Sequence, residues 1–159
     1  MEKCVTDVFS KRKRSALMSR IRGRGNKATE LEFVRLLRAQ KVTGWRRHVS
    51  VTLPKQKNET VISKHPRVRP DFVFQSSRIA VFIDGCFWHG CPIHGTSPEN
   101  NSRFWSEKLE GNRKRDRHVT RELRRKKWVV FRFWEHQLGQ GEELIRRLRR
   151  ELELRIEQG

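Results

Sequence analysis

The stretch that decides the fold is residues 69–84, RPDFVFQSSRIAVFID. Two short runs of apolar residues, rich in β-branched and aromatic side chains, lie on either side of a polar turn, which is typical of a β-hairpin. The first predicted strand spans 69–74, with Asp71 near its start, and Asp84 ends the second. Because antiparallel pairing brings those two ends together, we expect both carboxylates at one edge of the hairpin.

Helix and strand patterns alternate along the rest of the chain. Thr29 and Glu32 have capping-box spacing, and apolar residues at helical spacing follow, so a helix is expected to about Gln40. The other predicted elements are a strand at 45–51, a long helix at 103–127, a strand at 128–134 and a helix at 141–157. The predicted order is therefore α, β, β, β, α, β, α.

Two segments stand apart from this order. Residues 1–27 are expected to form a basic N-terminal arm, in which 11–22 predicts a short basic helix that glycines at 23 and 25 break. The polar stretch 54–66 predicts an exposed loop of unusual length, to which the sequence assigns no role. The remainder, 28–159, has the size of a single domain.

The charge of the chain points to a polyanionic partner. Its 37 Lys and Arg residues outnumber its 18 Asp and Glu residues, for a formal net charge of +19. Such a field attracts nucleic acid, although ribosomal proteins and proteins of the membrane surface can be equally basic. Five Trp and nine Phe residues lie among the basic residues, which favours a folded nucleic-acid-binding protein.

No segment predicts insertion into a membrane. The chain lacks a stretch of roughly 18 apolar residues, and its N-terminus lacks the apolar segment of a signal peptide. We therefore expect a cytoplasmic, nucleoid-associated protein.

Metal-binding residue types are concentrated in residues 85–94, GCFWHGCPIH. Two thiols and two imidazoles at this spacing can supply most of a tetrahedral zinc site. In a reducing compartment, cysteines beside histidines indicate metal binding more than a disulfide, with unmetallated thiols as the alternative. The spacing leaves open which of His89 and His94 would bind the metal.

Three sheet strands, a crossover helix and a fourth strand, with carboxylates on the second and third strands, form the layout of the restriction-endonuclease-like nuclease core. From about Lys13 to Arg147 the chain resembles the very-short-patch repair (Vsr-type) endonucleases, which are bacterial DNA mismatch nickases. The residues that carry the resemblance are Met18-Ser19-Arg20-Ile21-Arg22, Thr29-Glu30, Arg69-Pro70-Asp71-Phe72, Gly85-Cys86-Phe87-Trp88-His89, Phe104-Trp105, Lys108, Asn112, Arg115-Asp116 and Trp134-Glu135.

The resemblance implies a fold, a reaction and partners. We expect an α/β fold with a mixed central sheet flanked by helices, in a monomeric Mg²⁺-dependent DNA endonuclease. It would nick one strand of duplex DNA at a T·G mismatch, initiate very-short-patch repair and contact mismatch-repair proteins. Two alternatives remain: a related nuclease without mismatch preference, linked to restriction or mobile elements, and a non-catalytic, zinc-supported DNA-binding module.

Asp71 and Asp84 are the first candidates for phosphodiester hydrolysis, because carboxylates can hold Mg²⁺. The resemblance implies that Asp71 is the metal ligand, assisted by the main-chain carbonyl of Ile83. Asp84 departs from the best-studied members, which carry a histidine there. It is expected to contribute a second charge or a direct Mg²⁺ contact, and an Asp-Gly turn after a strand is the alternative.

Three further residues are expected to support the reaction. His89 is the candidate general base, because an imidazole titrates near working pH. The resemblance implies that Asp116 orients His89 and that Glu30 is a supporting carboxylate. The alternatives are an ion pair on the helix surface for Asp116 and an interaction with the helix dipole for Glu30.

The resemblance also completes the zinc site. In similar enzymes the closing ligand follows the last core strand in a Trp-Glu-Cys sequence, where this chain has Trp134-Glu135-His136. Histidine is also a zinc ligand. The expected Zn²⁺ ligands are therefore Cys86, Cys91, His94 and His136, and the competing assignment uses His89.

The remaining expected sites contact DNA. By analogy with the intercalating residues of the family, Phe87, Trp88 and Trp105 would insert between base pairs, which is easiest at a mismatched step. The alternative, that large aromatics belong to the core, is preferred for the other tryptophans. The expected phosphate-binding residues are Arg20, Arg22, Lys108, Asn112 and Arg115, and they would make binding strongly salt-dependent.

Overall fold

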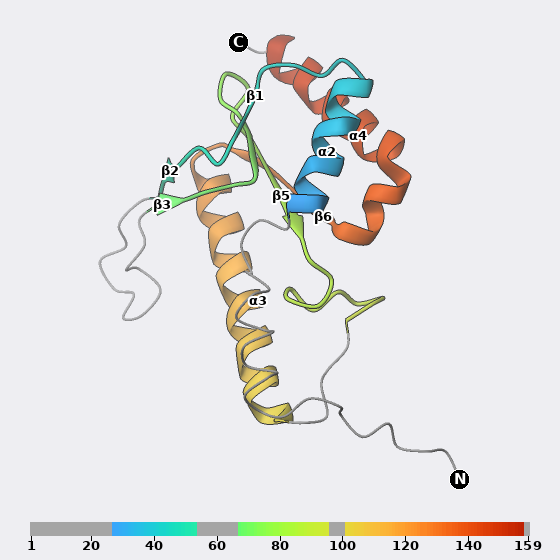
Figure 1. Cartoon of the computed structure of the whole chain (residues 1–159). Coiled ribbons are helices and arrows are strands. Elements are labelled where there is room, and N and C mark those ends of the chain that lie inside the picture. The colour runs from blue at the N-terminus through green and yellow to red at the C-terminus, as the bar shows by residue number, and fades with distance from the viewer. Residues whose placement is uncertain (1–26, 54–66, 96–100, 158–159) are drawn as a thin grey trace.

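The structure is a computed structural model that describes residues 27–53, 67–95 and 101–157 (Figure 1). The expected basic arm, with Arg20 and Arg22, lies outside the described residues except for its last residue, Lys27, where the first described helix begins. The expected polar loop at 54–66 lies outside them too.

The chain has a mixed α/β fold built on a four-stranded central sheet. Its strand order is β1-β4-β5-β6, and β2 and β3 form a separate two-stranded sheet. The elements are α2 (Lys27–Ala39), β1 (Trp45–Arg47), β2 (Val51–Thr52), β3 (Arg67–Val68), β4 (Phe72–Phe74), β5 (Ile79–Asp84), α3 (Ser102–Arg125), β6 (Val129–Trp134), the 3₁₀ helix η1 (Glu135–Gln140) and α4 (Gly141–Glu157). The fold class expected from the sequence is confirmed.

The predicted hairpin is present, and a parallel strand joins it. β4 pairs with β5 in antiparallel orientation, with Phe72 opposite Val81, and β5 pairs with β6 in parallel, with Phe82 beside Arg132. The long helix α3 connects β5 to β6, because parallel neighbours need a crossover. The carboxyl end of β5 therefore lies beside that of β6, where Asp84 is paired with Trp134.

Two strand predictions were wrong in their extent. The strand expected over 45–51 ends at Arg47, because His48 has a left-handed backbone with φ of 53°. The strand expected from Arg69 begins at Phe72, since Pro70 has no N–H for a sheet ladder. The sequence patterns also missed η1, in which the Gln137 side chain accepts a hydrogen bond from the backbone N–H of Trp134 at 2.9 Å.

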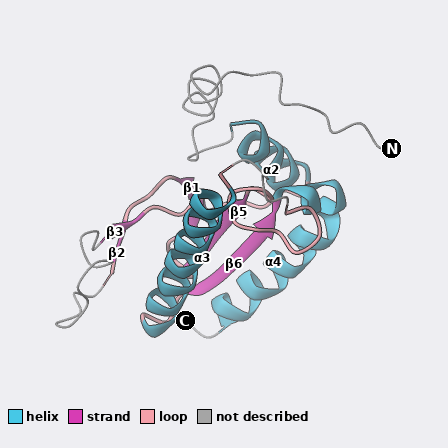
Figure 2. Cartoon of the chain, turned by 90° about the horizontal axis from the view of Figure 1, so that it is seen from below, coloured by secondary structure: helices cyan, strands magenta, loops and turns pink. Residues whose placement is uncertain are grey.

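Helices cover both faces of the central sheet (Figure 2). On one face α2 and α4 pack on the sheet, around Phe33, Phe72 and Phe133. On the other face Leu123 of α3 packs against Val73 and Ala80. Side chains alternate along β5, so Phe82 and Asp84 point to the α3 face. None of the helices in the described ranges is long and apolar enough to cross a membrane.

Candidate active site

Asp71 lies at the start of β4, where the hairpin brings it to the end of β5. Its Oδ2 accepts a hydrogen bond from the backbone N–H of Ile83 at 2.7 Å. The pKa of Asp71 is raised to about 6, first by burial and then by the nearby charges of Glu30 and Asp84, against the opposing effect of this hydrogen bond. A cation beside this buried carboxyl group would favour its ionised form and lower its pKa.

A second carboxylate, Glu30 in the first turn of α2, lies close to Asp71. Glu30 is 2% exposed, and its Oε2 forms ion pairs with Arg47 and with Nε2 of His48, the latter at 3.0 Å. Its other oxygen, Oε1, is buried and has no hydrogen-bond partner among the residues that the structure describes. Glu30, His48 and Asp71 each offer one ligand atom, and these atoms lie within 4.8 Å of one another.

These three residues fit a divalent cation. No described residue forms a hydrogen bond with the buried Oε1 of Glu30, and carboxylate oxygens are the ligands that Mg²⁺ prefers. Two carboxylates and one imidazole can all bind a divalent cation, and their ligand atoms lie close together.

Asp84 is bound to Arg132 of β6. Arg132 donates from Nε and Nη2 to the two carboxylate oxygens of Asp84, each at 2.7 Å, and its Nη2 lies 3.0 Å from Oδ1 of Asp116. The parallel register explains this contact, since Arg132 lies beside Phe82 and shares its face with Asp84. Asp84 faces this guanidinium and does not belong to the group formed by Glu30, His48 and Asp71.

His89 pairs with Asp116 on α3. Its Nδ1 lies 2.5 Å from Oδ2 of Asp116 and 3.7 Å from Oδ1 of Asp84. Partial burial would raise the pKa of Asp116, but the hydrogen bond with His89 and the charge of Arg132 hold it below its usual value. Asp116 is therefore a carboxylate that can fix the orientation of the imidazole.

The side chain of Asn112 fixes the loop that carries His89 to α3. Nδ2 of Asn112 donates to the backbone carbonyl of Trp88 at 2.8 Å, and the backbone N–H of His89 donates to that of Gly85 at 3.2 Å. Gly90 has φ of +64°, a conformation that suits glycine. Asn112, expected at a phosphate, thus makes a contact within the protein.

Cys86, Cys91, His94 and His136 form a second group whose ligand atoms lie within 4.8 Å of one another. Nδ1 of His136 is 3.1 Å from Sγ of Cys86 and 3.6 Å from Sγ of Cys91. Burial raises the pKa of the Cys86 thiol. The four side chains expected to bind zinc are thus brought together, and this group could hold a metal ion.

The three expected wedge residues also gather in one place. The ring centroid of Phe87 lies 5.1 Å from that of Trp88 and 5.3 Å from that of Trp105, both in edge-to-face geometry. All three side chains are partly exposed, and Phe104 next to them is 59% exposed. The described residues thus include an aromatic cluster at the loop that also holds His89.

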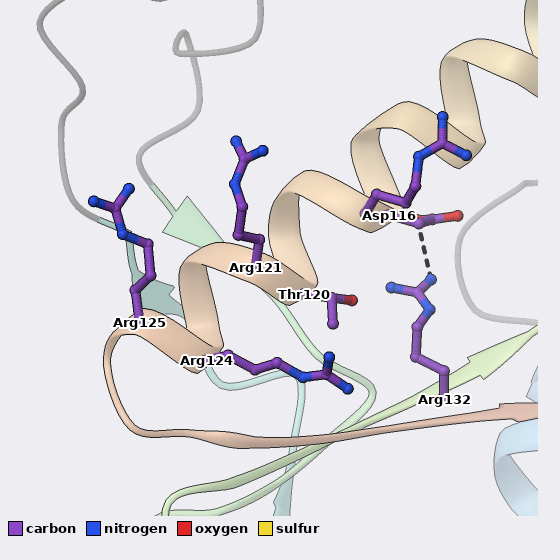
Figure 3. Close-up of a pocket in the computed structure, with 7 residues that line it drawn as sticks. Asp116, Thr120, Arg121, Arg124, Arg125 and Arg132 are labelled. Carbon is purple, nitrogen blue, oxygen red and sulfur yellow. Dashed lines mark ion pairs between the residues drawn. The ribbon is translucent and has the colours of Figure 1, made fainter.

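An arginine-lined cavity of about 680 Å³ lies along the C-terminal half of α3 (Figure 3). Asp116 and Arg132 form one end of the cavity, and their ion pair is the dashed line in Figure 3. Its other lining residues are Arg117, Thr120, Arg121, Arg124 and Arg125. Lys108 and Arg115, expected at phosphates, are exposed on the same helix.

Sequence patterns did not single out His48 or Arg132. His48 reaches Glu30 because the backbone turns at the end of β1, a turn with no glycine to signal it. Arg132 did carry a signal, since it is the one charged residue in the apolar run 128–134. A charge within a core strand indicates a buried partner.

Comparisons with known proteins identify relatives of this chain. A family model described as DNA mismatch endonuclease Vsr matches residues 6–94. The type II nicking enzyme V.NaeI of Lentzea aerocolonigenes is 52% identical over 71 residues, which cover 45% of this chain and 43% of that protein. DNA mismatch endonuclease Vsr of Escherichia coli is 38% identical over 78 residues, 48% of this chain and 49% of that protein.

The matched segments thus span less than half of these two relatives. A longer match exists to the type II nicking enzyme V.NmeAIP of Neisseria meningitidis, which is 32% identical over 152 residues, 93% of this chain and 97% of that protein. The family model and this match agree with the restriction-endonuclease-like arrangement of sheet and helices. The chain therefore belongs to the DNA mismatch endonuclease Vsr family.

Proposed function

We propose that this protein is a Mg²⁺-dependent endonuclease that nicks one strand of duplex DNA at a T·G mismatch and so initiates very-short-patch repair. The observation that carries the proposal is the contact of His89 with Asp116 of α3, at 2.5 Å, because His89 lies on the loop that also carries Phe87 and Trp88. A candidate base and an aromatic cluster are thus fixed together. The names of the relatives, a mismatch endonuclease and nicking enzymes, support the same reaction.

Asp71 and Glu30 would hold the catalytic cation, with the main-chain carbonyl of Ile83 as a further ligand. Bound Mg²⁺ would supply stabilisation for the negative charge that develops on the phosphate. The carboxyl group of Asp71 must be ionised to serve as a ligand. Its raised pKa therefore makes the site dependent on pH.

His89 would activate the attacking water. Because Nδ1 faces Asp116, Nε2 is the nitrogen that takes the proton, and Asp116 stabilises the imidazolium that forms. The water then attacks the phosphorus in line with the leaving oxygen. Asp84 contributes a second negative charge. It binds Arg132, whose guanidinium also contacts Asp116.

Zn²⁺ is the proposed occupant of the Cys86, Cys91, His94 and His136 group, because two thiolates and two imidazoles suit that ion. Its role would be structural. Through His136 it would join the loop that carries His89 to the segment that follows β6. Removal of the metal would then misplace both the base and the aromatic cluster.

The DNA would contact two features beside the proposed catalytic centre. Phe87, Trp88 and Trp105 would insert at the mismatched step, where unstacking costs least. The arginine-lined cavity on α3 would bind backbone phosphates next to the cleaved one, and Lys108, Arg115 and the basic arm at 1–27 would bind others. We propose that residues 28–159 act as one nuclease domain in a monomer.

The test compares two duplexes that differ only in one base pair, T·G or T·A, each labelled on the T strand. With Mg²⁺, the protein should nick the T·G duplex at least about tenfold faster, which corresponds to about 1.4 kcal/mol of selective stabilisation. Equal rates would establish a nuclease without mismatch preference. Stable binding to both duplexes without any nicking would establish the DNA-binding module.

A further inference from the structure

His48 lies beside two carboxylates that come from other elements. His48 directly follows β1, whereas Glu30 belongs to α2 and Asp71 precedes β4. The backbone N–H of His48 donates to the main-chain carbonyl of Asp71 at 3.2 Å, and its Nε2 lies 3.0 Å from Oε2 of Glu30. The backbone of His48 is therefore held beside Asp71, and its ring contacts Glu30.

A structural ion pair explains only part of this arrangement. The guanidinium of Arg47 already pairs with Oε2 of Glu30. Oε1 of Glu30 is buried and has no hydrogen-bond partner within the described ranges, in a residue that is only 2% exposed. A buried carboxylate oxygen without a partner costs free energy, so a bound cation that satisfies it would stabilise the site.

The spacing of the three ligand atoms suits a first-row metal. Metal–nitrogen and metal–oxygen bonds of about 2.1 Å place opposite ligand atoms about 4.2 Å apart and neighbouring ones about 3.0 Å apart. The ligand atoms of Glu30, His48 and Asp71 lie within 4.8 Å of one another. Nε2 of His48 and Oε2 of Glu30 already lie 3.0 Å apart, which is the spacing of neighbouring ligands, and His48, whose side chain is 44% exposed, has room to move as the three atoms draw together around an ion.

We propose that His48 is a metal ligand and completes a Glu30–His48–Asp71 site that binds a first-row transition metal such as Mn²⁺ more tightly than Mg²⁺. Mg²⁺ takes oxygen ligands almost exclusively, whereas imidazole nitrogen is a good ligand for transition metals. The inference rests on the proposed function in one respect, that this site also holds the catalytic cation. The imidazole sets the metal preference of that site.

The test measures metal binding without DNA. Mn²⁺ is added to the full chain, pre-incubated with Zn²⁺ to fill the cysteine group, and bound Mn²⁺ is followed by electron paramagnetic resonance. His48→Gln keeps a hydrogen-bond donor towards Glu30 and removes the imidazole. Because loss of even an outer partner costs a metal site about 10–100-fold in affinity, this variant should bind Mn²⁺ at least about tenfold more weakly.

Mg²⁺ affinity, measured by competition with Mn²⁺, should change much less than Mn²⁺ affinity in His48→Gln. His118→Gln is the matched control, because His118 lies on α3 outside both groups of metal-binding residues, and it should bind Mn²⁺ as the parent does. Equal Mn²⁺ affinity in the parent and His48→Gln would overturn the proposal. The nicking assay with Mg²⁺ does not depend on this measurement. Failure of the inference and failure of the proposed function are therefore distinguishable.

A second measurement needs no substitution and so applies if His48→Gln fails to fold. Pulsed electron paramagnetic resonance on the Mn²⁺-loaded parent chain detects nitrogen nuclei coordinated to the ion. A coupling typical of imidazole nitrogen is expected. Its absence from protein that binds Mn²⁺ would overturn the proposal, and so would a lack of Mn²⁺ binding.

Discussion

Arg132 binds Asp84 through two parallel hydrogen bonds of 2.7 Å each, one to each carboxylate oxygen. Both residues are largely buried, with side-chain exposures of 21% for Arg132 and 8% for Asp84. Arg132 also contacts Asp116, whose Oδ2 pairs with Nδ1 of His89. The guanidinium therefore links the end of β5 to helix α3, and its loss should affect stability and the proposed activity together.

Arg132→Gln should lower the free energy of unfolding by about 3 kcal/mol or more, because it leaves the carboxylate of Asp84 buried without its partner. Urea denaturation provides the measurement. Arg103→Gln is the matched control, since Arg103 and its partner Glu107 are exposed and such pairs contribute about 0–1 kcal/mol. In the double variant Arg132→Gln/Asp84→Asn the loss should be smaller than in Arg132→Gln. An equally large or larger loss there would contradict the role given to this pair.

The raised pKa of Asp71 predicts a pH-dependent contribution to stability. With a folded-state pKa of about 6 against an ordinary 3.8, folding favours the protonated carboxyl. Without a bound metal, stability should therefore fall as the pH rises from about 4 to about 6, by up to about 3 kcal/mol. Asp71→Asn should raise the free energy of unfolding at pH 8 and change it little at pH 4. A stabilisation of equal size at both values would rule out this titration.

The metal group predicts different outcomes for two substitutions at His136, whose Nδ1 lies 3.1 Å from Sγ of Cys86. His136→Cys keeps a zinc ligand, so it should retain about one zinc ion per chain. His136→Ala leaves three protein ligands and should lose zinc to a chelator and unfold at a lower temperature. Elemental analysis and thermal denaturation check this prediction. If both variants retained zinc equally after chelation, His136 would not be a zinc ligand.

The aromatic cluster predicts unstacking of DNA at the mismatch. Trp88→Ala should slow nicking of a T·G duplex at least about tenfold, since the wedge offsets an unstacking cost of a few kcal/mol. A fluorescent adenine analogue beside the mismatch should brighten with the parent chain and much less with Trp88→Ala. Phe104→Ala is the control, because Phe104 is exposed and adjoins Trp105 without belonging to the proposed wedge. Equal brightening by all three proteins would exclude Trp88 as a wedge.

Local patterns predicted the parts of the fold that local forces determine. α4 begins and ends where its apolar spacing and flanking residues indicate, and the hairpin follows from two apolar runs around a polar turn. The break at His48 was not predictable, because nothing in its neighbours demands a left-handed backbone. A tertiary contact, the hydrogen bond to the main chain of Asp71, accompanies that conformation.

The same distinction between local patterns and tertiary contacts applies to the candidate site residues. Asp71 and Asp84 were expected at one edge of the hairpin because pairing within a hairpin is local, and the hydrogen bond from Ile83 to Asp71 confirms that the two strand ends meet. The contact between Arg132 and Asp84 depends on the parallel register of β5 and β6, which no short pattern in the sequence specifies. His136 entered the candidate metal group only through the resemblance to a family.

The most direct test of catalysis at Asp71 compares the parent chain with Asp71→Asn on a T·G duplex labelled on the T strand, with Mg²⁺ present. The parent should nick the T strand, whereas Asp71→Asn should bind the duplex in a gel-shift assay and leave it intact, with a rate at least about 100-fold lower. Nicking by Asp71→Asn at the parental rate, or no nicking by the parent chain at all, would contradict the account.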